Sequence, residues 1–201
     1  MTGEASPPSA SSHGATRRLF FALWPDKAMQ AALAEATSAI VAACDGAAVP
    51  SKNFHLTLAF LGAVAEQRIA DLTPIAARVA LAYQAHAETA GAPIVITLDR
   101  IDYWRRSEIL CATATTSSVP ASALAGTLTS ALTEHGFAPD LKPFRTHATL
   151  ARKVRHVTRD RGMSAVHWTF RDFHLVESRT ASSGALYSTR EIYPLDASSR
   201  E

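Results

Sequence analysis

One short pattern, His-x-Thr-Leu, occurs twice in this chain and constrains its fold more than any other feature. The copies are His55-Leu56-Thr57-Leu58 and His147-Ala148-Thr149-Leu150, and Ala follows each of them. With this composition, chance supplies about 0.07 copies of the full pattern, so two copies indicate a duplicated local structure. Two shorter matches, at His156 and His167, contain the Thr but lack the Leu, and we treat them as chance occurrences.

Each copy is typical of a β-strand with one buried face. In the first copy, Leu56, Leu58 and Phe60 alternate with His55 and Thr57. In a strand, this alternation sends the two leucines and Phe60 into a core and presents His55 and Thr57 together on the opposite face.

The duplication extends beyond the motifs. Strand, helix, loop and motif strand are predicted in the same order twice. The first strand spans 17–24 and is followed by a helix from Asp26 to about Gly46, whereas the second spans 108–116 and is followed by a helix from Ser118 to Gly136. The distance is 36 residues both from Leu19 to His55 and from Cys111 to His147.

The remaining elements complete the fold class. A helical pattern covers 69–83, with Thr73 and Pro74 as a possible start after one preliminary turn. Further strands are predicted at 94–103, joined to 108–116 by a hairpin at 104–107, and as a final antiparallel pair at 166–176 and 185–193. We therefore expect an α+β fold of two pseudo-symmetric lobes, with mostly antiparallel sheets, helices on the outer faces and a central cleft.

Composition sets the domain plan and the compartment. The 201 residues are 47% hydrophobic, and we expect a disordered tail at 1–16, a single bilobal domain at 17–196 and a short tail at 197–201. No apolar run of about 18 residues suggests a membrane span, and residues 1–16 lack the features of a secretory signal. Cys44 and Cys111 are expected to be free thiols in a reducing cytoplasm.

Charge is informative through its distribution. The net charge of +2 is too small to indicate broad nucleic-acid binding. However, the stretch 142–161 contains seven Lys or Arg residues against the single acid Asp160, and His147 lies within it. This stretch suits a phosphate-bearing ligand, and the alternative is a solvated basic loop.

Two opposed imidazoles suit acid–base chemistry at a phosphodiester. In an in-line displacement, one group deprotonates the nucleophile and another protonates the leaving oxygen, and histidine titrates near neutrality. The Thr two residues after each His shares its face and can donate to a phosphate oxygen. The ligand spacing of a zinc site, the G-x-S-x-G of a serine hydrolase and the nucleotide-binding P-loop are all missing from the sequence.

Three segments, at 18–23, 50–62 and 144–153, resemble the bacterial RNA 2′,3′-cyclic phosphodiesterases, also called 2′-5′ RNA ligases, of the two-histidine phosphoesterase superfamily. The resemblance covers 17–195. It implies a bilobal fold, opening of 2′,3′-cyclic phosphates to 2′-phosphates without metal or cofactor and, in some members, reversible 2′-5′ ligation. It also implies that Arg152 helps to hold the phosphate.

The expected site thus contains His55 and His147 as catalytic residues, with Thr57, Thr149 and Arg152 binding the phosphate. In this hypothesis His55 protonates the departing 3′-oxygen and His147 activates water, although the reverse assignment stays open. Strict alternation places Arg152 on the face opposite His147, so its role requires the strand to bend or end near Ala151.

The expected ligand is RNA or a nucleotide that carries a 2′,3′-cyclic phosphate, and the expected oligomeric state is a monomer. Two alternatives remain open: a non-catalytic module that binds RNA or nucleotides, and 2′-5′ ligation as the working reaction.

Overall fold

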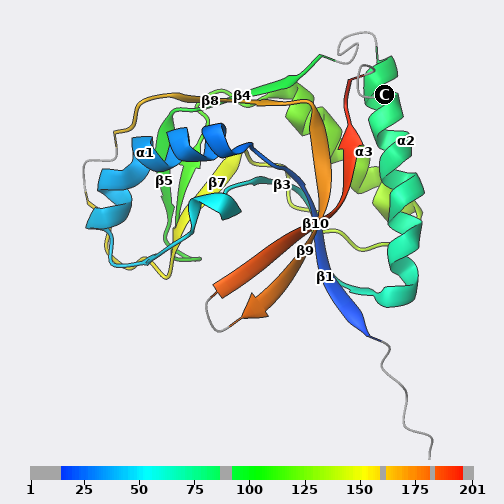
Figure 1. Cartoon of the computed structure of the whole chain (residues 1–201), viewed down its shortest axis with the longest axis horizontal. Coiled ribbons are helices and arrows are strands. Elements are labelled where there is room, and N and C mark those ends of the chain that lie inside the picture. The colour runs from blue at the N-terminus through cyan, green and yellow to red at the C-terminus, as the bar shows by residue number, and fades with distance from the viewer. Residues whose placement is uncertain (1–14, 87–91, 159–161, 182–183, 197–201) are drawn as a thin grey trace, which may run out of the picture.

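The structure is a computed structural model that describes residues 15–86, 92–158, 162–181 and 184–196. It has the α+β class predicted, with antiparallel pairing throughout its sheets and two lobes side by side (Figure 1). The first strand begins at Thr16, the last residue of the predicted N-terminal tail, and pairs with Ala65. Ala15, also within that predicted tail, accepts a hydrogen bond from the backbone N–H of Glu66. Residues 1–14 of the predicted N-terminal tail and the whole predicted C-terminal tail, 197–201, lie outside the described residues.

The first lobe is built on a four-stranded sheet in the order β10-β9-β1-β3. Its strands are β1 (Thr16–Leu23), β3 (Leu56–Ala65), β9 (Asp172–Ala181) and β10 (Gly184–Pro194). The helices α2 (Leu72–Ala85) and α3 (Val119–Glu134) pack against each other and contact β10 and β3, respectively. The 3₁₀ helix η2 (Glu66–Asp71) precedes α2, as the predicted preliminary turn.

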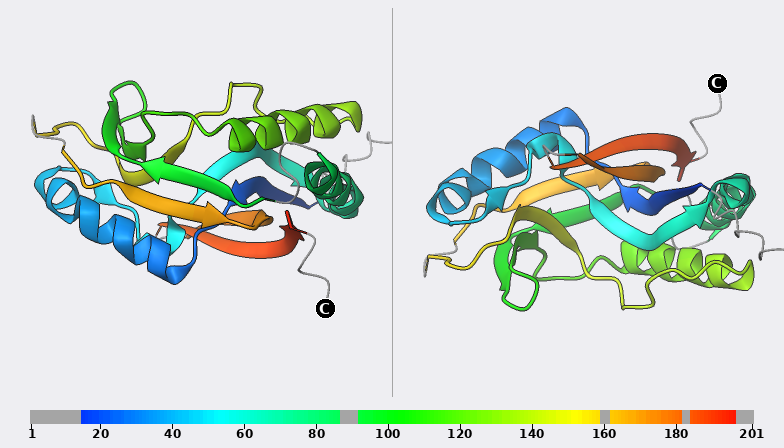
Figure 2. Two further views of the ribbon diagram at one scale, coloured as in Figure 1. Left: turned by 90° about the horizontal axis from the view of Figure 1, so that it is seen from above. Right: turned by 90° about the horizontal axis from the view of Figure 1, so that it is seen from below.

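The second lobe contains a sheet in the order β2-β7-β6-β5 and a separate two-stranded sheet, β4-β8. Its strands are β2 (Ala47–Ala48), β4 (Ile94–Leu98), β5 (Arg100–Trp104), β6 (Ile109–Thr113), β7 (His147–Arg152) and β8 (Val166–Phe170). The helix α1 (Lys27–Ala43) lies beside these strands (Figure 2). The short η1 (Ser51–Asn53) contacts α1 and leads into the first motif.

The duplicated order of elements is confirmed, but each duplicated helix packs on the opposite lobe. Helix α1 connects β1 to β3 yet contacts β7 and β8, whereas α3 connects β6 to β7 yet contacts β3. Both helices begin as predicted, because the side chains of Asp26 and Ser118 accept hydrogen bonds from the backbone N–H three residues on. This exchange joins the lobes through one continuous apolar core.

Two predicted strands were too long. The strand predicted at 94–103 divides at Asp99, and the strand predicted at 166–176 divides at Arg171; the first parts, β4 and β8, pair with each other. The alternation of buried Ile94, Ile96 and Leu98 breaks before the buried Ile101, so the chain must change direction between them. The predicted hairpin between β5 and β6 and the extension of one sheet by β9 and β10 are confirmed.

Two glycines give a matched test of this packing. A Cβ on Gly46 would lie 2.8 Å from the Arg152 carbonyl oxygen and 2.3 Å from a Val154 methyl, whereas a Cβ on Gly126, within α3, would meet nothing within 4 Å. We expect Gly46→Ala to lower the free energy of unfolding by about 1–3 kcal/mol. Gly126→Ala should raise it by about 0.5–1 kcal/mol because alanine favours the helix. Urea denaturation of both variants measures the difference, and a stable Gly46→Ala protein would contradict the close packing at β2 and β7.

Candidate active site

The two motif strands meet although they belong to different sheets: β3 and β7 contact each other directly. In β3, a bulge at Leu58 shifts the register, so that Thr57 pairs with Ala22 and Phe60 pairs with Phe20. Because Ala22 and Phe20 share one face of β1, Thr57 and Phe60 share a face as well. The prediction that Phe60 points into the main core was therefore wrong, and its ring belongs to the cleft side.

A bulge at the matching place in β7 changes the position of Arg152. His147, Thr149 and Arg152 pair with Thr113, Cys111 and Ile109, which lie on one face of β6, and the register shift falls at Leu150. Arg152 consequently shares the face of His147 and Thr149. The bulge at Leu150 therefore supplies the bend in β7 that a phosphate-binding role for Arg152 requires.

Both imidazoles are held in the same way. Nδ1 of His55 lies 2.7 Å from the carbonyl oxygen of Asn53, and Nδ1 of His147 lies 2.8 Å from that of Arg145. A carbonyl oxygen only accepts, so each Nδ1 carries its proton and donates. Each Nε2 has no hydrogen-bond partner among the described residues and can exchange a proton with a ligand.

A pocket of about 410 Å³ opens at the first motif. His55, Thr57 and Arg152 line it together with Arg18, Phe60 and Tyr187. The pocket thus brings three of the five predicted site residues to one surface, with Arg152 arriving from the other lobe. His147 and Thr149 lie next to this surface, on the Arg152 face of β7.

The electrostatics connect the two motifs. Burial, with smaller contributions from the nearby His147 and Arg152, lowers the pKa of His55 to about 4, and the hydrogen bond to Asn53 opposes this shift. Burial also lowers the pKa of His147, and the charges of Arg145 and Arg152 act in the same direction. Arg152 therefore lies close enough to both imidazoles to act on each, and both rings are neutral at pH 7 in the free protein.

Aromatic rings enclose the histidines, and sequence reasoning missed most of them. Trp24 stacks on His55 with 5.1 Å between centroids and 2° between planes, and Phe20 and Tyr187 contact the same ring from other sides. Trp104 lies 4.6 Å from the ring of His147. These contacts fix the imidazoles in orientation. The aromatic run before Pro25 was the only sequence signal for Trp24.

The two incomplete matches lie elsewhere. Nδ1 of His156 is 2.7 Å from the Asp45 carboxylate, and Nδ1 of His167 is 3.0 Å from the Thr97 hydroxyl; neither residue lines the pocket. Within the basic stretch 142–161, Lys142 and Arg155 pair with acids on the surface, so these two cations are not held ready for a phosphate-bearing ligand.

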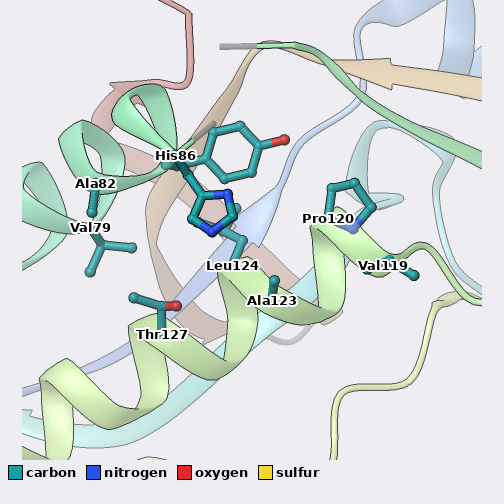
Figure 3. Close-up of a pocket in the computed structure, with 9 residues that line it drawn as sticks. Val79, Ala82, His86, Val119, Pro120, Ala123, Leu124 and Thr127 are labelled. Carbon is teal, nitrogen blue, oxygen red and sulfur yellow. The ribbon is translucent and has the colours of Figure 1, made fainter. Parts of the chain in front are cut away.

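A second pocket, of about 340 Å³, lies between α2 and α3 (Figure 3). Its walls are mostly apolar and include Val79, Leu124 and Pro120. Among the described residues that line it, His86 is the only imidazole, and none carries a cationic or acidic side chain. None of the predicted site residues lines it, so we place the candidate chemistry in the first pocket.

Groups of metal ligands and membrane-spanning helices are both missing from the described ranges. No group of three or more His, Cys, Asp or Glu side chains there is arranged to hold a metal ion. A bilayer-crossing helix would need a longer apolar stretch than any helix of the described chain provides. Cys44 and Cys111 are both free thiols.

Comparison with known proteins gives a consistent result. Residues 23–110, which include the first motif, match the family model described as LigT-like phosphoesterase. No curated protein gives a significant sequence match.

Solved structures extend the likeness over about 90% of the chain. Escherichia coli LigT complexed with 3′-AMP is 25% identical, with a TM-score of 0.77 over 90% of this chain and 99% of that one. A structure described as a phosphoesterase is 25% identical, with a TM-score of 0.76 over the same shares. The Thermus thermophilus protein TT0787 is 26% identical, with a TM-score of 0.74 over 90% and 99%.

Proposed function

We propose that the chain is a LigT-like phosphoesterase and that it hydrolyses 2′,3′-cyclic phosphates on RNA ends or nucleotides to 2′-phosphates. His147 is the base that activates water, and His55 is the acid that protonates the departing 3′-oxygen. Thr57, Thr149 and Arg152 bind the phosphate, and neither a metal nor a cofactor takes part.

The observation that carries this proposal is the pair of equivalent imidazoles, each with Nδ1 donating to a carbonyl and Nε2 open to a ligand. Water attacks phosphorus while its proton passes to Nε2 of His147. The bond from phosphorus to the 3′-oxygen breaks, and that oxygen takes the proton from Nε2 of His55. The products are a 2′-phosphate and a free 3′-hydroxyl, and exchange with solvent restores the two protonation states.

The bound substrate favours the protonated form of His55 that the mechanism requires. In the free protein, burial keeps His55 neutral at pH 7 because its pKa is about 4. A bound phosphodiester places a negative charge beside the ring and favours the imidazolium form. Arg152 and the two threonine hydroxyls, which have no hydrogen-bond partner among the described residues, then stabilise the charge that develops on the phosphate oxygens.

The similarity to LigT complexed with 3′-AMP supports a nucleotide as the ligand of this fold. We further propose that the protein acts in the cytoplasm, where Cys44 and Cys111 stay reduced, and that it acts as a monomer. Size-exclusion chromatography with light scattering tests the oligomeric state.

The test of the function is incubation with a nucleoside 2′,3′-cyclic phosphate in the presence of EDTA, followed by identification of the product isomer. We expect a 2′-phosphate at an unchanged rate. A 3′-phosphate product would mean that the 2′-oxygen, and not the 3′-oxygen, is the leaving group. Loss of turnover in EDTA would contradict the metal-free mechanism. Binding without turnover would identify a non-catalytic module, and joined products with a 5′-hydroxyl RNA would favour ligation.

A further inference from the structure

Most arginines near the sheets are neutralised by the protein itself. Among the described residues, ion pairs with carboxylates are made by Arg17, Arg68, Arg100, Arg155, Arg171, Arg179 and Arg190. Arg18 and Arg152 line the candidate pocket, and within the described chain no carboxylate pairs with either. In the proposed mechanism Arg152 binds the reacting phosphate, whereas Arg18 has no role.

Arg18 is held in place by an aromatic ring. Its guanidinium carbon lies 4.6 Å from the centroid of Phe60, which shares the face of Thr57. This contact fixes the plane of the guanidinium but satisfies none of its N–H donors. An exposed, oriented and unpaired guanidinium at a pocket wall is suited to an anionic group of the ligand.

The strand register gives the spacing. Along β1, the cleft face presents Ala22 opposite Thr57, then Phe20 opposite Phe60, and then Arg18 beside Ser178 of β9. Figure 2 shows β1 between β3 and the β9–β10 pair. At about 3.3 Å per residue, Arg18 begins about 13 Å along the strand from the Thr57 row. A phosphate-binding row is thus followed by an aromatic row and then by a second polar row.

We propose that Arg18 is a specificity-determining residue that binds the phosphate on the 5′ side of the terminal nucleotide. The proposal rests on the proposed function. The terminal nucleotide places its cyclic phosphate at Thr57 and Arg152 and spans the aromatic row. The next phosphate of the chain reaches Arg18, with the hydroxyls of Ser178 and Thr180 on the same pocket wall. An RNA end then binds better than a mononucleotide because only the RNA end carries that second phosphate.

The experiment compares two substrates with the same terminal nucleoside: its 2′,3′-cyclic phosphate alone, and the dinucleotide that ends in that cyclic phosphate. We expect the wild-type protein to prefer the dinucleotide. Arg18→Met should lower kcat/KM for the dinucleotide about ten-fold more than for the mononucleotide. The slope of log kcat/KM against log salt for the dinucleotide should shrink by about 0.7, because one phosphate contact is lost.

Arg68→Met is the matched control. Arg68 also lies over an aromatic ring, 4.4 Å from the centroid of Phe137, but it is outside the candidate pocket. This variant should keep the wild-type kcat/KM for both the mononucleotide and the dinucleotide. Arg18→Lys retains the charge and should keep most of the salt slope.

Equal losses on both substrates in Arg18→Met, or a wild-type protein without preference for the dinucleotide, would overturn the role of Arg18. Absence of turnover on both substrates would contradict the proposed function instead. In that case, equilibrium binding of the dinucleotide 2′-phosphate to wild type and Arg18→Met still tests Arg18. Weaker binding of this ligand by the variant supports the inference, and unchanged binding rejects it.

Discussion

Replacing either His55 or His147 by Ala is expected to lower kcat/KM for a nucleoside 2′,3′-cyclic phosphate by about 10² to 10⁴-fold. In the proposed mechanism, each variant removes the imidazole that moves a proton on its side of phosphorus. The double variant should lose about as much as the more damaged single variant, because one imidazole cannot complete the reaction without the other. Initial rates with the 2′-phosphate product quantified by chromatography measure these losses.

His167→Ala is the control for this experiment. His167 also belongs to a His-x-Thr sequence, but it lies on β8 with its Nδ1 3.0 Å from the Thr97 hydroxyl, outside the pocket. We expect its activity to match the wild type. Circular dichroism and urea denaturation of all variants separate a lost proton transfer from a lost fold. Full activity in His55→Ala or His147→Ala would remove the acid–base pair from the mechanism.

The pairing of the two motifs could be predicted from sequence because it rests on local rules. Alternation at His55 and Thr57 presents both side chains on one face, and the same rule holds at His147 and Thr149. The same rule failed at Phe60 and Arg152, each three residues after the threonine of its motif. Bulges at Leu58 and Leu150 shift the register before these positions. A bulge depends on how two strands meet, so strict alternation placed Phe60 wrongly and left Arg152 undecided.

The surroundings of the motifs could not be predicted from local patterns. Trp24 stacks on His55 because β1 pairs beside β3, and Arg145 lies over the ring of Trp104 because β5 and β7 belong to one sheet. These neighbours are distant in sequence or come from a loop. The exchange of α1 and α3 between lobes is equally a tertiary choice, since each helix has an apolar stripe that either lobe could cover.

The pH dependence of kcat/KM follows from the two lowered pKa values. The group that must be neutral makes the rate rise with pH, and the group that must be charged makes it fall above its own pKa. His55 has a pKa of about 4, and that of His147 lies below the ordinary value of about 6.5. We therefore expect a bell-shaped profile with its maximum on the acidic side of pH 6.5 and about a ten-fold loss per pH unit above it. The shape is the same whichever histidine is the base.

Arg152→Met should alter both the size and the position of this bell. The phosphate loses a charge-assisted donor, so kcat/KM at the optimum should fall about ten- to hundred-fold, mainly through KM. Because the cation lowers the pKa of both histidines, its removal raises both values and moves both limbs to higher pH.

Arg145→Met provides the comparison that assigns the limbs. The charge of Arg145 acts on the pKa of His147, so we expect only the limb that belongs to His147 to move. The moving limb identifies His147 in the profile, and the stationary limb identifies His55. If both limbs stay in place in Arg152→Met, the two imidazoles do not share the field of that guanidinium, and the convergence of the two motifs on one phosphate is wrong.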